Sequence, residues 1–136
     1  MQDEPIYYIG GDEEDQHQVT RALAEIGIPN KLVHFEDGPQ LMDHMRTTHT
    51  KPFLILCDLR LPGMSGLELR EEINNDRKLR SMSIPFIFLS ESVPPRDVER
   101  AYLSLVQGFY QKPSDYDELK EQLQIICQYW ARAIRP

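Results

Sequence analysis

The sequence predicts an α/β protein in which helices cover both faces of a parallel β-sheet. Short apolar stretches alternate along the chain with longer stretches whose apolar residues recur at helical spacing. Two of the short stretches, residues 53–57 (FLILC) and 85–90 (PFIFLS), are almost continuously apolar. Such strands are typical of parallel sheets, which are buried on both faces. The alternation and the short connections therefore predict a doubly wound sheet in one domain.

Five strands and five helices are expected in strict alternation. In the first helix, Val19, Leu23 and Ile26 lie on one face, and Gly27 ends the helix as a C-terminal glycine commonly does. Prolines 94 and 95 begin the fourth helix. The expected strands are 5–9, 31–35, 53–57, 85–90 and 107–111, and the expected helices are 14–26, 39–48, 65–77, 94–105 and 115–133.

Length and charge narrow the class of protein. The chain has 136 residues and a net charge of −7, which suits one domain and disfavours binding to nucleic acid or to an anionic membrane. No apolar run approaches the roughly 20 residues of a membrane span, and no leader is evident. Cys57 and Cys127 are expected to be buried thiols in a reducing cytosol. We expect a cytoplasmic single domain over residues 1–136 without an output domain.

Three chemically active side chains follow neighbouring strands. Binding crevices in such sheets lie outside the carboxyl ends of the strands. Asp58 follows the third strand, Ser90 ends the fourth and Lys112 follows the fifth. The carboxylate could act as a nucleophile, while the ammonium and the hydroxyl could stabilise charge on a transferred phosphoryl group. A simple ion pair at the sheet rim is the alternative, and the joint placement of the three groups favours the functional interpretation.

The stretches that carry these residues resemble a known family. LILCDLRLPGMSGLEL (54–69), PFIFLS and GFYQKP (108–113) resemble the receiver domain of bacterial two-component response regulators. The resemblance covers about residues 5–130, and it implies a flavodoxin-like five-stranded sheet of order 2-1-3-4-5 with five helices. The slightly long spacer NNDRKLRSMSIP (74–85) is similar to that of stand-alone receivers that resemble partners of bacterial phytochromes.

The resemblance also implies roles for individual residues. Asp58 would be the phosphoacceptor, and Ser90 the switch hydroxyl that moves to the phosphoryl group. Lys112 would pair with a phosphoryl oxygen and with Asp58, and the peptide bond after it would be cis. Phe109 matches the aromatic switch position, and Arg60 would offer its backbone carbonyl to a metal ion.

The two residues after the first strand depart from the family. The family has two carboxylates there that hold Mg²⁺ and offset the charge of an incoming phosphoryl group, but this chain has Gly10 and Gly11. The helix that follows keeps the family spacing from residue 10, so a register that aligns Asp12 with the pair is rejected. Two outcomes stay open: a weakened Mg²⁺ site in which Asp12 and the Arg60 carbonyl join Asp58, or a metal-independent receiver. Lost or strongly weakened Mg²⁺ binding is favoured.

Other interpretations of residues 10–14 (GGDEE) are rejected. The stretch resembles a diguanylate cyclase signature, but it lies before an amphipathic helix and near the start of the sequence, whereas that signature lies in a hairpin within a longer domain. A dinucleotide-binding loop needs Gly-x-Gly-x-x-Gly after the first strand, and only Gly10 and Gly11 are present. Glu13 and Glu14 are expected to form a solvated, dipole-stabilised first turn of the helix.

The resemblance predicts a single-domain response regulator in phosphorelay signal transduction, not an enzyme. It would accept phosphate on Asp58 from a histidine kinase or phosphotransfer protein. A downstream protein is expected to contact the surface formed by residues 94–105, 107–111 and 115–133. No nucleic acid or membrane partner is expected, and homodimer formation stays open. The alternative is a phosphorylation-independent pseudo-receiver that acts as a binding module.

Overall fold

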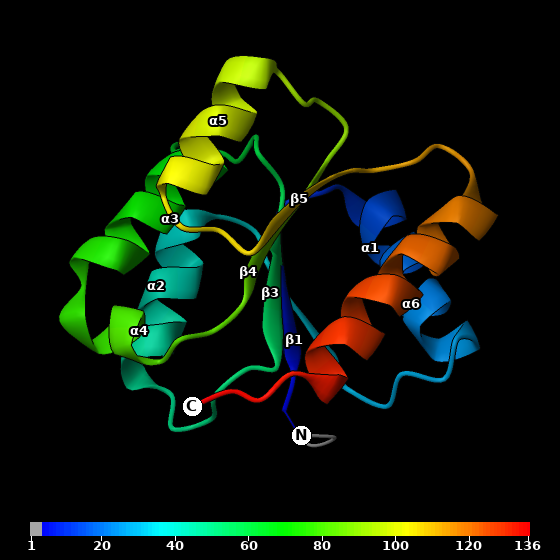
Figure 1. Cartoon of the computed structure of the whole chain (residues 1–136), viewed down its shortest axis with the longest axis horizontal. Helices are drawn as coiled ribbons and strands as arrows, with labels where there is room; N and C mark the ends of the chain where they lie inside the picture. Colours follow the sequence, from blue (N-terminus) through cyan, green and yellow to red (C-terminus); the bar gives the residue numbers. More distant parts are fainter. Residues whose placement is uncertain (1–3) are drawn as a thin grey trace.

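The computed structural model describes residues 4–136 and contains one five-stranded sheet (Figure 1). The strand order is β2-β1-β3-β4-β5, and every neighbouring pair is parallel. The predicted fold class and strand order are therefore confirmed. The strands are β1 (Ile6–Ile9), β2 (Leu32–Phe35), β3 (Leu54–Cys57), β4 (Phe86–Ser90) and β5 (Gly108–Gln111).

Helices cover both faces of the sheet. Figure 1 shows α1 and α6 on one face and α2, α3, α4 and α5 on the other. None of these helices, within residues 4–136, is both long and apolar enough to cross a bilayer. The helices are α1 (Glu13–Glu25), α2 (Gly38–Thr47), α3 (Gly66–Asn75), α4 (Arg77–Ser81), α5 (Pro95–Leu103) and α6 (Tyr116–Arg132).

The expected number of helices was too low by one. The additional helix is α4, a short helix in the connection between α3 and β4. Asp76 ends α3 and also caps α4, because its side chain accepts a hydrogen bond from the N–H of Leu79 at 3.1 Å. Five residues carry too little apolar periodicity to distinguish a helix from a loop in the sequence.

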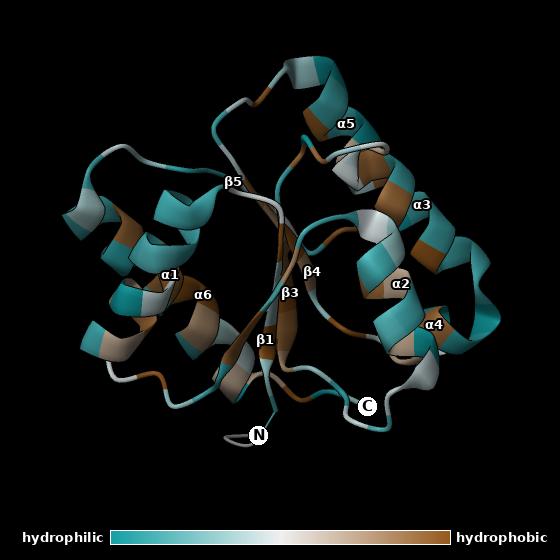
Figure 2. Cartoon of the chain, turned by 180° about the vertical axis from the view of Figure 1, so that it is seen from behind, coloured by the Kyte–Doolittle hydropathy of each residue, from teal (hydrophilic) through white to brown (hydrophobic). Residues whose placement is uncertain are grey.

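The sheet is buried on both faces, which explains its continuous apolar strands. Successive side chains of a strand point to opposite faces, so Ile55 packs towards α2–α5 whereas Leu54 and Leu56 pack towards α1 and α6. Figure 2 shows the apolar strands at the centre and hydrophilic colour on the outer surfaces of the helices. The chain forms one core on each side of the sheet.

Main-chain hydrogen bonds continue beyond the carboxyl ends of the strands and bring the loops together. The N–H of Asp58 donates to the carbonyl of Ile9 at 3.0 Å, and the N–H of Lys112 donates to the carbonyl of Ser90 at 2.9 Å. The N–H of Gly10 donates to the carbonyl of Phe35 at 3.1 Å. These bonds fix the residues after β1, β3 and β5 at one rim of the sheet.

Candidate functional site

Asp58 lies half-buried at the centre of this rim, directly after β3. Its Oδ1 accepts two hydrogen bonds, from the backbone N–H of Arg60 and from the hydroxyl of Ser90, both at 3.2 Å. Within residues 4–136 no donor is bonded to Oδ2. The two bonds orient the carboxylate and leave one oxygen available to a reactant.

A cleft of about 620 Å³ opens beside Asp58. Most of its lining residues are polar or acidic, and Arg60 is the one basic residue among them. The lining residues are Gly10, Gly11, Asp12, Asp15, Glu36, Asp58, Arg60, Pro62, Ser90, Glu91 and Ser92. The structure thus brings together the predicted residues 12, 58, 60 and 90 around one concave site.

Lys112 lies in the same region, but it has a different partner from the one expected. Its Nζ forms an ion pair with Oδ1 of Asp15, and its side chain is only 6% exposed. The expected pair between Lys112 and Asp58 is therefore not formed in this structure. The expectation of a cis bond between Lys112 and Pro113 is wrong, because residues 4–136 contain no cis peptide bond.

Asp15 is the site residue that the sequence analysis missed. It is the third residue of α1, where it forms a reciprocal capping box with Asp12. The N–H of Asp15 donates to Oδ1 of Asp12 at 2.8 Å, and the N–H of Asp12 donates to Oδ2 of Asp15 at 3.2 Å. The spacing Asp-x-x-Asp after a strand signals the cap, but the contact with Lys112 joins segments that are far apart in sequence.

The two glycines adopt a backbone that other residues rarely adopt. Gly10 has φ +93° and Gly11 has φ +75°, both in the left-handed region. A Cβ on Gly10 would lie 2.8 Å from the Cβ of Asp58, and a Cβ on Gly11 would lie 2.6 Å from the hydroxyl of Tyr8. Side chains at these two positions would therefore be strained and would collide with the site.

Two aromatic residues support the glycine loop. The buried hydroxyl of Tyr8 lies beside Gly11. Burial strongly raises the pKa of Tyr8, and the charge of Asp58 acts in the same direction, so the phenol stays neutral. The Nε2 of His34 is 2.8 Å from the carbonyl oxygen of Gly10, and its ring packs edge-on against Tyr8. Neither residue was identified from the sequence as part of this region.

Phe109 lies half-buried on β5, beside the core formed with α2–α5. Its ring stacks on Phe88 with 5.0 Å between centroids and an interplanar angle of 29°. Phe88 precedes Ser90 by two residues on β4, so the two side chains point to the same face of the sheet. A ring at position 109 is thus placed next to the element that carries the predicted switch hydroxyl.

The carboxylates at this site do not form the Mg²⁺ centre that the family has after its first strand. Mg²⁺ requires near-octahedral oxygen ligands. Within residues 4–136 no group of three or more His, Cys, Asp or Glu side chains is arranged to hold a metal ion. Asp12 caps α1, Asp15 is bound to Lys112, and Gly10 and Gly11 carry no side-chain oxygen.

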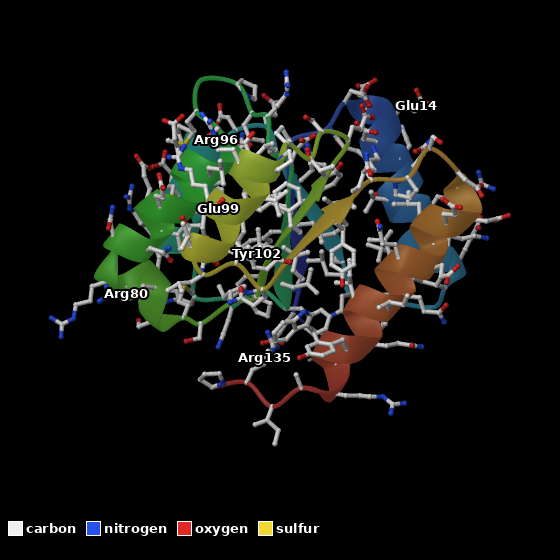
Figure 3. The ribbon with its side chains drawn as sticks, turned by 45° about the horizontal axis from the view of Figure 1, so that its top comes forward. Glu14, Arg80, Arg96, Glu99, Tyr102 and Arg135 are labelled. Atoms are coloured by element: carbon white, nitrogen blue, oxygen red, sulfur yellow. The ribbon has the colours of Figure 1, made fainter. Side chains whose placement is uncertain are left out.

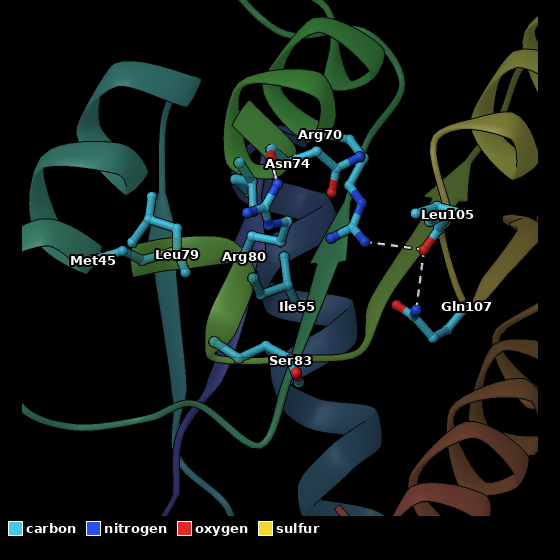
Figure 4. Close-up of a pocket in the computed structure, with 11 residues that line it drawn as sticks. Met45, Ile55, Arg70, Asn74, Leu79, Arg80, Ser83, Leu105 and Gln107 are labelled. Atoms are coloured by element: carbon cyan, nitrogen blue, oxygen red, sulfur yellow. Dashed lines mark hydrogen bonds between the residues drawn. The ribbon is translucent and has the colours of Figure 1, made fainter. Parts of the chain in front are cut away.

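A smaller cavity, of about 230 Å³, lies near the amino ends of β3, β4 and β5 (Figure 4). Arg70 of α3 lies beside it and is 9% exposed. The guanidinium donates from Nε to the carbonyl of Ser104 at 3.1 Å and from Nη2 to that of Leu105 at 2.9 Å. Asn74 and Gln107 donate to the same two carbonyls. These bonds satisfy the C-terminal end of α5, so we interpret the cavity as part of a structural clamp.

The surface formed by α5, β5 and α6 exposes large apolar side chains. Tyr102 is 51% exposed, Leu105 is 67% exposed and Tyr129 is 65% exposed. Figure 3 shows Arg96, Glu99 and Tyr102 along α5. A groove of about 410 Å³ between β5 and α6 includes Tyr110 and Trp130 in its lining. Exposed apolar patches of this kind often mark protein contacts.

The fold and the rim residues define a receiver domain, and comparison with known proteins supports that class. Residues 9–124 match the family described as the response regulator receiver domain. The chain belongs to this family, and it is a receiver-domain response regulator of two-component signalling.

Two relatives of known description are aligned over most of this chain. The probable methanogenesis regulatory protein FilR2 of Methanothrix harundinacea is 30% identical over 116 residues, which are 82% of this chain and 74% of FilR2. Response regulator Rcp1 of Synechocystis is 26% identical over 95% of this chain and 90% of Rcp1. The chain spans only 7% and 24% of two longer relatives.

Solved structures show the same fold. The phosphorylated cyanobacterial phytochrome response regulator RcpA superposes with a TM-score of 0.86 at 27% identity, covering 98% of this chain and 97% of RcpA. The Mn²⁺-bound form of Rcp1 superposes with a TM-score of 0.83 at 26% identity, covering 97% of each chain.

Proposed function

We propose that this chain is a phosphoacceptor in a phosphorelay, with Asp58 as the acceptor. An oxygen of Asp58 attacks the phosphorus of a phosphohistidine, the P–N bond breaks, and the released imidazole nitrogen takes up a proton. The product is an acyl phosphate on Asp58, which water later hydrolyses to regenerate the carboxylate. The donor is a histidine kinase or a phosphotransfer protein. The chain is a signalling domain rather than an enzyme.

The geometry around Asp58 is the observation that carries this proposal. Oδ1 is held by Ser90 and by the N–H of Arg60, while Oδ2 is available at a cleft wide enough for a phosphoryl donor. A nucleophile held in position loses less entropy when it reacts. The hydroxyl of Ser90 is already within hydrogen-bond distance of the acceptor, where it can donate to a phosphoryl oxygen.

Binding of Mg²⁺ is weak in the proposed mechanism. Mg²⁺ would supply counter-charge for the phosphoryl group. A relative with 26% identity was solved with Mn²⁺ bound, but Gly10 and Gly11 carry no oxygen-bearing side chains towards this cleft. The remaining ligands would be Asp58, the Arg60 carbonyl and Asp12, and Asp12 would have to loosen its cap of α1.

The test is incubation of the purified chain with acetyl phosphate or phosphoramidate, with Mg²⁺ and with a chelator. Intact-mass spectrometry should detect one added phosphoryl group in the wild type and none in Asp58→Asn. The yield should depend only weakly on Mg²⁺. An absence of adduct with every donor and divalent ion would rule out the proposed function.

A second candidate is a pseudo-receiver that binds its partner without phosphate. The pairing of Lys112 with Asp15, and not with Asp58, favours this alternative. The two candidates differ in cells: Asp58→Asn should abolish signalling by a phosphoacceptor and should leave a pseudo-receiver active.

The output surface in either case is the face formed by α5, β5 and α6. Phe109 lies on β5 beside the core under α5, and Tyr102 and Tyr129 are exposed on the flanking helices. A shift at Ser90 would reach this face through Phe88 and Phe109, which stack. Phosphorylation would change the population of a state that binds a downstream protein or a second copy of the chain.

A further inference from the structure

The carboxylate of Asp15 joins the first turn of α1 to the end of β5. Its Oδ1 forms the ion pair with Nζ of Lys112, and its Oδ2 accepts the hydrogen bond from the N–H of Asp12. The Asp15 side chain is 22% exposed, so water screens the pair only in part. Both oxygens are engaged, which gives the carboxylate a defined position.

The absence of a side chain at Gly11 is what allows this position. A Cβ on Gly11 would lie 3.1 Å from the Cβ of Asp15 and 2.6 Å from the hydroxyl of Tyr8. A carboxylate at position 11 would therefore displace the residues that now lie there. Gly11 leaves the space that Asp15 needs. The carboxylate that faces Lys112 therefore comes from Asp15, about one helical turn after position 11.

The ion pair creates a competition when Asp58 is phosphorylated. The phosphoryl group adds negative charge to a cleft that Asp12, Asp15 and Glu91 already line. To stabilise that group, the ammonium of Lys112 has to leave Asp15 and turn towards Asp58. Departure of Lys112 leaves the Asp15 carboxylate unpaired beside a second anion, and like charges at short distance repel.

We propose that Asp15 is a positioning residue that holds Lys112 in the resting state and competes with the phosphoryl group for it. The inference rests on the proposed function of Asp58 as phosphoacceptor. Asp15 opposes accumulation of the acyl phosphate and shortens its lifetime. When phosphorylation makes Lys112 change its partner, the ion pair that joins α1 to the end of β5 is also broken.

The experiment measures the steady-state fraction of phosphorylated chain with acetyl phosphate, by intact-mass spectrometry. Asp15→Asn removes the charge with little change in size and should raise the ratio of phosphorylated to unphosphorylated chain about tenfold. Asp15→Glu keeps the charge and suits the capping box, so its ratio should stay near that of the wild type. Glu13→Gln removes an exposed charge in the same first turn of α1, where no ion pair or hydrogen bond links Glu13 to Lys112, and it controls for net charge.

A second measurement needs no variant. The ¹⁵N resonance of the Lys112 amine in the wild type should shift when acetyl phosphate is added, because the amine changes its partner. This readout keeps the test valid if Asp15→Asn is poorly folded. An amine signal that does not move in the phosphorylated wild type would overturn the inference.

The outcomes separate this inference from the proposed function. A wild type that is labelled on Asp58, with Asp15→Asn no better labelled than Glu13→Gln, overturns the role of Asp15 and leaves Asp58 as acceptor. A wild type that is never labelled overturns the proposed function and this inference together. A higher ratio for Asp15→Asn, with Asp15→Glu near the wild type, supports the role of Asp15.

Discussion

Lys112 and Arg70 are both buried cations, but their partners differ in kind. Lys112 lies at the carboxyl rim of the sheet, and a single carboxylate, Asp15, neutralises it. Arg70 lies near the opposite rim, and within residues 4–136 no carboxylate forms an ion pair with it. Its partners are the backbone carbonyls of Ser104 and Leu105.

Because the partners differ, the contact of Lys112 is exchangeable and the contact of Arg70 is fixed. A carboxylate can be replaced as the partner of Lys112 by another anion of similar chemistry, such as a phosphoryl group. The carbonyls at the end of α5 cannot leave Arg70 without unravelling the helix end. The negative end of the α5 dipole offsets part of the Arg70 charge, and burial lowers the pKa of Arg70 from its ordinary value. Arg70 therefore stabilises the fold, whereas Lys112 takes part in the chemistry of the site.

The strongest test of this contrast is replacement of Arg70. We expect Arg70→Leu to lower the free energy of unfolding by about 3 kcal/mol, because the carbonyls of Ser104 and Leu105 each lose a charged donor. Urea denaturation followed by circular dichroism measures the loss. Arg80→Leu is the control, since Arg80 lines the same cavity from the surface. Equal losses in the two variants would contradict a clamp at Arg70.

The second test weakens the Lys112 contact through its supporting glycine. We expect Gly11→Ala to lower the free energy of unfolding by about 2 kcal/mol, because a left-handed φ is strained for alanine and the methyl group would meet Tyr8. Gly63→Ala is the matched control, since Gly63 has φ +79° and nothing lies within 4 Å of its added Cβ. If both variants lose the same amount, strain alone accounts for the effect, and the close approach of Tyr8 contributes nothing.

The smallest effect on the free energy of unfolding is expected for an ion pair on the surface of α3 and α5, the two helices that Arg70 joins. Glu71 of α3 and Arg100 of α5 form a bidentate pair at 2.7 and 3.2 Å, but both are largely solvated. We expect a coupling of about 0.5 kcal/mol in a double-mutant cycle, because water screens exposed pairs. A coupling as large as the loss in Arg70→Leu would mean that surface charge, and not the buried clamp, joins α3 to α5.

The same pair gives a pH dependence of known sign. The hydrogen bond from Arg100 lowers the pKa of Glu71 below its ordinary value. A carboxyl whose pKa is lowered in the folded state stabilises the protein above the unfolded pKa. The coupling should therefore be present at neutral pH and should disappear as the pH falls through the lowered pKa of Glu71, which the same double-mutant cycle can follow in acid.

Local patterns in the sequence were sufficient for most of the fold. Continuous apolar strands, helical spacing from Val19 onwards and the stop at Gly27 predicted alternating elements, because these signals depend on neighbours in sequence. The five-residue helix α4 was missed, since one short turn has no periodicity of its own. The positions of Asp58 and Ser90 at one rim also followed from the alternation, because parallel strands place their carboxyl ends together.

The sequence by itself determined the family, the strand order that the family implies and the loss of the acidic pair at Gly10 and Gly11. Only the tertiary structure decided which anion neutralises Lys112. That choice depends on the left-handed turn at Gly11 and on the buried hydroxyl of Tyr8, which together place Asp15 of α1 against the end of β5. Contacts between segments nearly a hundred residues apart are fixed by packing, and no local spacing encodes them.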